Sequence, residues 1–535
     1  VNALLAIQKI VHQYPHCWRC NSPIIYRATE QWFCSVNGFK DEAIKAIETV
    51  KWIPEWGEDR IKGMVRDRSD WCISRQRTWG VPIPIVYCKD CGKPIVNDET
   101  IKAIADIFRK EGADAWWTKE PDEFIPASVK CDCGCSEFTK EYDIMDVWFD
   151  SGVSHSAVME QYDCLNFPAD LYLEGADQYR GWFQSSLLTS VVYHGCAPYK
   201  AVCTHGWVVD GEGKTMHKSL GNGIDPSEIT DKFGADILRL WVASSDYHSD
   251  IRISQPILNQ LSDAYKKIRN TARFILGNLG NGTGFDPDKD SVSDDKLTEL
   301  DKWALMKLDA LIDKVNEGYN AFDFHIAFHA IHNFCVIDMS NFYLDIIKDR
   351  LYCEKENSEL RRAAQTTMYR ILSAVARLAA PIISFTAEEI WQFMPHASSD
   401  DKDSIFLNQM PEKSGITFTD EYISKWEFIY NVRETVNKLL EEKRNEKTIG
   451  KSLEAKIIAY CNEPTYAKCC SMAEQLKEVL IVSDFAVEKT DSDELKFEVV
   501  KAEGEKCDRC WCYSTTVGQN AEHPTLCARC ANSVK

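Results

Sequence analysis

Paired cysteines are the strongest chemical signal in the sequence. The pairs Cys507-x-x-Cys510 and Cys527-x-x-Cys530 lie close together near the end of the chain. Two such pairs offer four thiolates, enough to close a tetrahedral zinc site without any other ligand. Four unrelated buried cysteines are the alternative, but two matched pairs at so short a separation favour zinc. We interpret Cys512 as a neighbour that does not bind the metal.

A second set of cysteines contains one candidate ligand too many. Its members are Cys88 and Cys91, a CxxC pair, and the later Cys131, Cys133 and Cys135. Zinc is again the favoured interpretation, and spacing alone leaves open which of the last three bind it. A further pair, Cys17-x-x-Cys20, has no matching pair nearby. It is either free of metal or completed by residues outside this sequence.

A glycine-bounded loop carries a lysine directly after a predicted strand. Its sequence, GEGKTMHKSLGN, covers residues 211–222. Such a loop can close on a triphosphate, and Lys218 would then stabilise the charge that develops on the leaving pyrophosphate. Read alone, the pattern is more typical of a solvated hairpin turn.

The segment EGADQYRGWF, residues 174–183, places polar side chains at the end of the apolar run LYL. Open α/β sheets bind ligands at the ends of their strands. Glu174 and Asp177 could therefore hold an ammonium group. Trp148 and Trp182 could line an apolar pocket beside them, although large aromatic residues more often belong to an ordinary core.

Length and composition indicate that several domains position these groups. The chain has 535 residues, 44% hydrophobic and 27% charged, which exceeds the usual size of one core. No apolar run is long enough to cross a bilayer, so no membrane span is expected. The 22 cysteines, without an export signal, favour reduced thiols and metal binding over disulfides. The opening residues are expected to lie inside a longer protein.

The net charge of −20 argues against attraction to phosphate over the whole surface. A nucleic-acid partner would need local basic patches. One candidate strip lies on the helix predicted after Pro256, where basic residues alternate with apolar ones at helical spacing. Its members are Lys266, Lys267, Arg269 and Arg273.

Hydrophobic periodicity predicts an α/β region followed by an α-helical one. The runs LYLEG and YKAVCTHGWVV flank a helical stretch, Gly181 to Tyr193, as in half of a doubly wound parallel sheet. Beyond residue 256, a bundle of amphipathic helices extends to about residue 400. The helices after the first are expected at Leu297 to Tyr319, Phe322 to Ile347 and Glu359 to Phe393, the last bent by Pro381. A mixed region containing the helix VRETVNKLLEEKRNEK follows.

Several segments, taken in order, resemble the class I isoleucyl-tRNA synthetase family. They are CWRC…YRATEQWF, SDWCISRQRTWGVPIP, DVWFDSG, EGADQYRGWFQSSL, HGWVVDGEGKTMHKSLGN, SDAYKKIRNTARF and CDRCW…HPTLCARC. The resemblance spans nearly the whole chain. It implies a multidomain α/β plus α fold, with the second half of a Rossmann-type class I catalytic domain, a helical-bundle anticodon-binding domain and zinc-ribbon modules.

The resemblance also implies domain boundaries. Residues 1–35 would end an editing and connective insertion, 36–145 would form a connective insertion with a zinc module, and 146–255 the catalytic half-domain. Residues 256–400 would bind the anticodon, 401–505 would form a C-terminal junction, and 506–535 a zinc finger.

Site roles follow from the same resemblance. The segment TMHKS matches the family's ATP-binding KMSKS loop at Met216, Lys218 and Ser219, with Thr215 and His217 replacing the first lysine and serine. Positions that hold the aminoacyl-adenylate match Glu174, Asp177 and Gln178, and the isoleucine side-chain pocket matches Trp148 and Trp182. Tyr179 departs from the family's DQHRGWF.

For metals and tRNA, the resemblance implies one zinc site made by Cys88, Cys91, Cys131 and Cys133, and another made by the C-terminal four near the tRNA. Cys17 and Cys20 would be half of a third site. The strip from Lys266 to Arg273 would contact tRNA phosphates, which position the RNA more than they specify it. A merely solvated helix face is an equally common reading of any single lysine in it.

The implied reaction is activation of isoleucine by Mg²⁺·ATP and transfer to tRNA(Ile), in a cytoplasmic monomer. The sequence contains no HIGH motif, so we expect this chain alone to be inactive. The main alternatives are a non-catalytic tRNA-binding module and one half of a split synthetase. A zinc-ribbon scaffold without any RNA role is a third.

Overall fold

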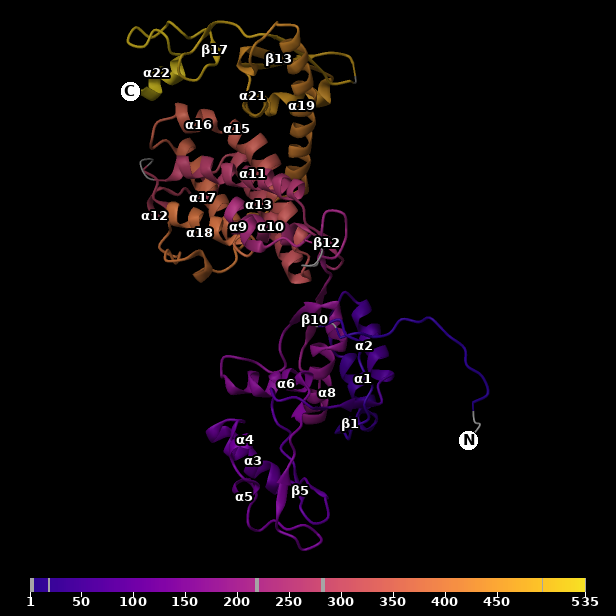
Figure 1. Cartoon of the computed structure of the whole chain (residues 1–535). Helices are drawn as coiled ribbons and strands as arrows, with labels where there is room; N and C mark the ends of the chain where they lie inside the picture. The colour runs from indigo at the N-terminus through magenta and orange to yellow at the C-terminus, as the bar shows by residue number, and fades with distance from the viewer. Residues whose placement is uncertain (1–3, 18–19, 217–220, 281–283, 493, 535) are drawn as a thin grey trace. The chain divides into compact units, whose positions relative to one another are not determined.

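The computed structural model describes the chain except for residues 1–3, 18–19, 217–220, 281–283, 493 and 535. The chain divides into two compact units, Val1–Gly206 and Trp207–Lys535 (Figure 1). The division after Gly206 lies inside the 146–255 segment. Among the described residues, no helix combines the length and apolar character that a membrane span requires.

A three-stranded parallel sheet forms the centre of the first unit. Its strands are β2 (Lys51–Ile53), β10 (Ala201–His205) and β9 (Tyr172–Gly175), in the order β2-β10-β9. Helices α1 (Lys40–Ile47), α2 (Trp56–Arg66) and α8 (Trp182–His194) share one buried core with it. The predicted strand–helix–strand unit, β9–α8–β10, is confirmed.

Helix α8 is buried because its sequence, WFQSSLLTSVVYH, has no charged residue apart from a terminal histidine. The helix ends at Gly195, whose φ of 73° is the left-handed conformation that glycine adopts without strain. At the other end of the helix, the backbone N–H of Trp182 donates to the Gln178 side chain at 2.9 Å.

The remainder of the first unit consists of small antiparallel pieces and short helices. Strands β5 (Val86–Cys88), β6 (Pro94–Ile95) and β7 (Phe138–Lys140) form one sheet, with α3 (Asp98–Glu111), α4 (Ala115–Thr118) and α5 (Pro121–Phe124) around Trp116. Strand β1 (Phe33–Ser35) pairs with β3 (Asp70–Cys72), and β4 (Ser74–Arg75) pairs with β8 (Ile144–Met145). Helices α6 (Val147–Gly152) and α7 (Ser154–Ala157) follow.

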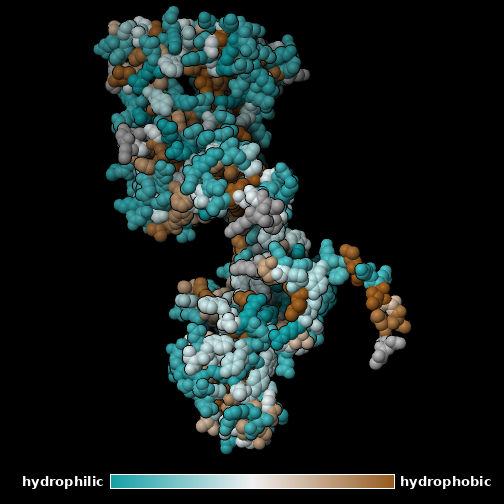
Figure 2. All heavy atoms as spheres, viewed as in Figure 1, coloured by the Kyte–Doolittle hydropathy of each residue, from teal (hydrophilic) through white to brown (hydrophobic). Residues whose placement is uncertain are grey.

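Helices make up most of the second unit. They are α9 (Pro226–Phe233), α10 (Ala235–Ser244), α11 (Gln255–Leu279), α12 (Pro287–Asp290), α13 (Glu299–Ala321), α14 (Phe324–Asn333), α15 (Leu344–Ile346), α16 (Lys348–Cys353), α17 (Glu359–Ala379) and α18 (Ser384–Phe393). The predicted bundle is confirmed, including the break around Pro381. A π-helical stretch, Phe334–Tyr343, joins α14 to α15. Hydrophilic side chains cover most of the visible face of this unit (Figure 2).

The C-terminal region shares the core of the bundle. Helix α19 (Asp420–Asn445) leads into a sheet of order β14-β13-β15, formed by β13 (Ala455–Cys461), β14 (Asp484–Lys489) and β15 (Lys496–Lys501), with α20 (Glu463–Ser471) and α21 (Ala473–Leu480). A terminal module contains β16 (Glu505–Lys506), β17 (Tyr513–Ser514) and α22 (Ala528–Val534). The short pair β11 (Val208–Val209) and β12 (Ile251–Arg252) lies near the start of the unit.

Candidate active site, metal centres and nucleic-acid interface

A braced turn follows strand β9 at its carboxyl end. In the 3-10 helix Ala176–Arg180, the Gln178 side chain donates to Asp177 Oδ2 at 3.0 Å and accepts from the backbone N–H of Trp182 at 2.9 Å. One amide therefore fixes both the neighbouring carboxylate and the start of α8. Glu174 and Asp177 are exposed. Two carboxylates thus stand at the strand end, where a cationic group of a ligand could reach them.

Gly175 lets the backbone approach the neighbouring side chains closely at the start of this turn. A Cβ at Gly175 would lie 2.8 Å from Asp177 Oδ1 and 3.4 Å from His205 Cε1. His205 ends β10, is paired in register with Gly175, and its Nδ1 lies 2.8 Å from the Gly206 carbonyl. Sequence reasoning missed His205. Its position as the last residue of a central parallel strand was the available signal.

The two predicted tryptophans contact different parts of this region. Trp182 stacks on Tyr172, with centroids 4.0 Å apart, and its Nε1 donates to the Ser151 carbonyl at 3.0 Å. Trp148 is 40% exposed and packs over Gly181, where a Cβ would lie 2.9 Å from the indole ring. The ring of Trp182 is thus fixed against the first residue of β9, whereas the partly exposed ring of Trp148 lies over the turn.

Tyr179 belongs to the turn, but its side chain is buried in the core. Its ring is fully buried beside Trp52 and Trp56, and its hydroxyl lies 2.9 Å from Thr204 Oγ1. Burial raises the pKa of Tyr179 above its ordinary value, so the phenol is neutral. A Cβ at Gly57 would lie 2.1 Å from the same hydroxyl, so the tyrosine fits only against glycine. This departure from the family motif is thus accommodated by the core.

The lysine-bearing loop belongs to the second unit. Asp210 accepts from the backbone N–H of Glu212 at 3.0 Å and of Lys214 at 2.8 Å, and Asn222 donates to it at 2.9 Å. These contacts close a turn at the start of the loop and hold the pKa of Asp210 low, with the Asn222 amide as the largest cause. Met216 packs against the cluster that contains Trp241. Lys218 and Ser219 lie outside the described residues.

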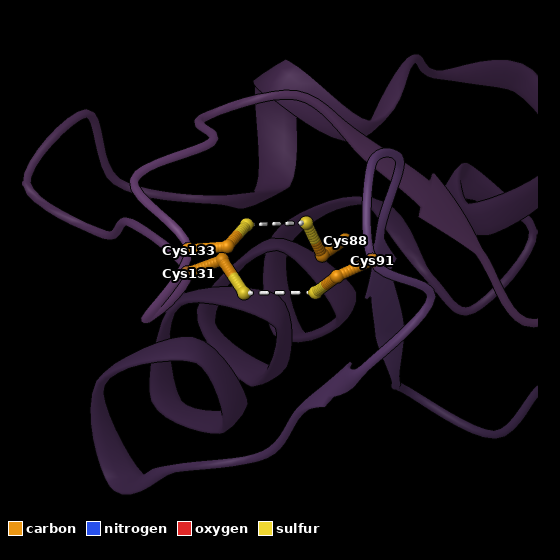
Figure 3. Close-up of side chains that lie close together, drawn as sticks. All are labelled: Cys88, Cys91, Cys131 and Cys133. Atoms are coloured by element: carbon orange, nitrogen blue, oxygen red, sulfur yellow. Dashed lines mark hydrogen bonds between the residues drawn. The ribbon is translucent and has the colours of Figure 1, made fainter.

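The first cysteine cluster consists of Cys88, Cys91, Cys131 and Cys133 (Figure 3). Their sulfurs all lie within 4.8 Å of one another, with Cys88–Cys133 at 3.5 Å and Cys91–Cys131 at 3.4 Å. Four thiolates on one zinc ion would have sulfurs about 3.8 Å apart. The backbone N–H of Cys91 helps to lower the pKa of Cys88 to about 6, which favours the thiolate that a metal needs.

Cys135, the surplus candidate, is not part of this group of four. Its sulfur accepts from the Glu137 N–H at 3.4 Å and donates to the Glu137 carbonyl at 3.6 Å, and it also interacts with the side chains of Asp90 and Cys88. The intervening Gly134, at a φ of 91°, permits the reversal of the chain between Cys133 and Cys135. The geometry therefore selects Cys131 and Cys133 from the three candidates.

The second cluster joins the C-terminal pairs Cys507, Cys510, Cys527 and Cys530. The sulfurs of Cys510 and Cys527 are 3.9 Å apart, again near the spacing of a four-thiolate zinc site. The neighbouring thiol of Cys512 lowers the pKa of Cys510 to about 4. Cys512 itself stays outside the group, as expected from the sequence.

The Cys17 carbonyl accepts from the Asn21 N–H at 2.8 Å, and Asn21 directly follows Cys20. Within the described part of the chain, neither belongs to a group of three or more metal-binding side chains.

Two surfaces of the second unit are suited to nucleic acid. The predicted strip on α11 (Lys266, Lys267, Arg269 and Arg273) is exposed, and Lys266 pairs with Asp263 at 2.9 Å. A groove of about 1110 Å³ lies between α16, α19 and the terminal module. Trp511, 52% exposed, lines it with the ammonium groups of Lys451 and Lys506 at 5.1 and 5.5 Å from its ring. An exposed indole between lysines can stack on an unpaired base.

Comparisons with known proteins match most of the chain. The model "tRNA synthetases class I (I, L, M and V)" matches residues 10–254, "Anticodon-binding domain of tRNA ligase" matches 301–459, and "Zinc finger found in FPG and IleRS" matches 504–532. The isoleucine–tRNA ligase of Caldanaerobacter subterraneus subsp. tengcongensis is 53% identical over 545 residues, which include 100% of this chain. That of Caldicellulosiruptor bescii is 56% identical over 536 residues, or 99% of the chain. The chain belongs to the isoleucyl-tRNA synthetase family. It spans 58% of the length of each of these relatives.

The fold of this synthetase chain is shared with more distant relatives. A Mycobacterium tuberculosis methionyl-tRNA synthetase bound by methionyl-adenylate aligns with a TM-score of 0.50 and 16% identity, over 72% of this chain and 66% of that one. The likeness supports the class I architecture alone. The predicted family and fold class are confirmed, and the cysteine clusters are zinc-binding modules of this synthetase family.

Proposed function

We propose that the chain supplies part of the active site of an isoleucine–tRNA ligase. In this reaction the isoleucine carboxylate attacks the α-phosphorus of ATP, giving isoleucyl-adenylate and pyrophosphate. The terminal ribose hydroxyl of tRNA(Ile) then takes the isoleucyl group and AMP leaves. The observation that carries the proposal is the Gln178-braced turn, which presents exposed carboxylates at the carboxyl end of β9, with Trp148 packed over Gly181 of the same turn.

Each residue of the turn has a role in this proposal. Glu174 binds the isoleucine ammonium group, and Asp177 and Gln178 hold the adenylate. Trp148 and Trp182 enclose the branched side chain, since an indole wall offers area without polar groups. Met216, Lys218 and Ser219 belong to the loop that binds ATP, with Mg²⁺ accompanying the nucleotide. Catalysis then consists of positioning and of stabilising charge on the leaving pyrophosphate.

The second unit would bind tRNA(Ile). The strip on α11 contacts phosphates, and the groove beside Trp511 accepts unpaired bases. We place the protein in the cytoplasm as a monomer, and we retain the six-part domain division given above as the functional description.

The test is isoleucine-dependent ATP–pyrophosphate exchange by this chain, alone and with a separately made N-terminal half that carries the HIGH region. We expect exchange only after mixing. Glu174→Gln should lower kcat/KM for isoleucine by about 10- to 100-fold, because a charged hydrogen bond is lost. Glu427→Gln, at an exposed carboxylate on α19, is the matched control and should change nothing.

Two results would contradict the proposal. One is normal exchange by the Glu174→Gln mixture. The other is no exchange by any mixture while the chain still binds tRNA, which would favour the non-catalytic binding module.

A further inference from the structure

The terminal zinc module is attached to the bundle through helix α16. The Arg529 guanidinium forms a bidentate pair with the Asp349 carboxylate, at 2.5 and 2.7 Å. Nearby, the Cys353 thiol donates to the Arg509 carbonyl at 3.6 Å. Arg529 lies between the cluster cysteines Cys527 and Cys530, so its backbone position is set by the metal site.

The same contacts set the geometry of the groove. Asp349, Tyr352 and Cys353 are three and four residues apart, so they lie on one face of α16. All three line the groove, and Trp511 lines it from the zinc module. The Trp511 backbone N–H donates to the Cys507 carbonyl at 2.9 Å. The backbone that carries the indole is therefore tied to the Cys507-x-x-Cys510 segment of the metal site. The contacts of the zinc module with α16 therefore fix the position of Trp511 relative to Tyr352 across the groove.

We propose that Asp349 and Arg529 are positioning residues for RNA binding: their ion pair holds the zinc module so that Trp511 faces the groove. The inference rests on the proposed tRNA function and adds residues that touch no RNA themselves. The side chains are 38% and 47% exposed, respectively, so the pair should contribute little to the stability of the fold. A bidentate pair does, however, restrict orientation strongly.

Charge reversal separates positioning from simple electrostatics. Asp349→Arg adds positive charge, which alone would strengthen binding to phosphate, whereas Arg529→Asp removes it. If the pair positions Trp511, both single variants of the whole chain should bind tRNA about 5- to 30-fold more weakly. The double variant D349R/R529D should recover affinity to within about threefold of the original, because the ion pair is restored with the same net charge.

The control is the exposed pair Lys413–Asp313, at 2.9 Å, which lies elsewhere in the second unit. Asp313→Arg should bind tRNA as well as the unchanged chain or slightly better. Zinc content should remain at two per chain in every variant, and the thermal midpoint should move by less than about 3 °C.

Several outcomes would overturn the inference. Single variants that bind like the unchanged chain would do so, and so would a double variant no better than the weaker single variant. A rise in affinity for Asp349→Arg matched by a fall for Arg529→Asp would show that net charge alone acts. Failure of the unchanged chain to bind tRNA would instead refute the tRNA function on which the inference rests.

Discussion

The choice of zinc ligands in the first cluster can be tested by three serine substitutions. Cys131→Ser and Cys133→Ser each remove a sulfur of the four-membered group, whereas Cys135→Ser removes a sulfur outside it that is hydrogen-bonded to the backbone of Glu137. We expect the first two variants to lose zinc from this site and the third to keep it.

The expected loss of zinc affinity follows from the binding free energy of a four-thiolate site. Structural zinc contributes about 10–16 kcal/mol of apparent binding free energy, so one ligand of four accounts for roughly 3 kcal/mol. At 1.4 kcal/mol per tenfold change, zinc affinity should fall by about 100-fold in Cys131→Ser and Cys133→Ser. Cys135 should not replace Cys133, because Gly134 reverses the chain between them and the backbone of Glu137 holds the Cys135 sulfur outside the group of four.

The assay is metal content after dialysis against a chelator of intermediate affinity. The C-terminal cluster provides an internal reference, because its four cysteines are unchanged. We expect two zinc ions per chain in the original and in Cys135→Ser, and one in the other two variants. One zinc in Cys135→Ser, or two in Cys133→Ser, would refute the ligand assignment.

Two further predictions concern the first unit. Gly181→Ala places a Cβ 2.4 Å from Gln178 Oε1, so we expect it to lower the free energy of unfolding by about 1–3 kcal/mol and the thermal midpoint by roughly 3–8 °C. The control is Gly63→Ala, whose Cβ would have nothing within 4 Å and should raise the midpoint slightly. Equal midpoints for the two variants would show that the turn accommodates the added methyl group. Burial, with a smaller contribution from His194, lowers the pKa of His155 from 6.5 to about 4, so the unfolded chain binds more protons between these values. The free energy of unfolding should therefore fall by on the order of 2 kcal/mol as the pH drops from 6.5 to 4. Urea titrations at several pH values should show that His155→Gln lacks this decrease. If the free energy of unfolding of His155→Gln depends on pH as it does in the unchanged chain, another group causes the decrease.

Sequence patterns predicted those elements whose signals are local. Helix α11 begins after Ser254 and ends at Leu279 because its apolar stripe is continuous, and the chain breaks near Pro381 because proline cannot continue a helix. The parallel unit β9–α8–β10 was equally clear, since two apolar strands flank a helix with almost no charge. The CxxC pairs were also local signals, and the clusters form as expected.

The features that sequence missed depend on contacts between distant residues. The groove beside Trp511 brings α16 together with a module about 160 residues later, and no periodicity encodes that approach. Spacing alone left the choice between Cys133 and Cys135 open, because it depends on the backbone at Gly134; the family resemblance chose Cys133, which is the cysteine in the cluster. The fully buried Asp301 accepts from Arg350 at 2.9 Å and from Tyr343 at 2.6 Å, partners that lie 49 and 42 residues further along the chain.

The two candidate sites share one way of holding an exposed group. At the end of β9, the exposed Asp177 is fixed by Gln178, which is itself tied to the buried start of α8 through the Trp182 N–H. In the zinc module, the backbone N–H of the exposed Trp511 donates to the Cys507 carbonyl, and Trp511 directly follows the ligand Cys510. In both places the accessible side chain is next in sequence to a residue that is itself held in place, Gln178 by the start of α8 and Cys510 by the metal site. Such groups lose little conformational entropy on binding, so a ligand meets them already oriented.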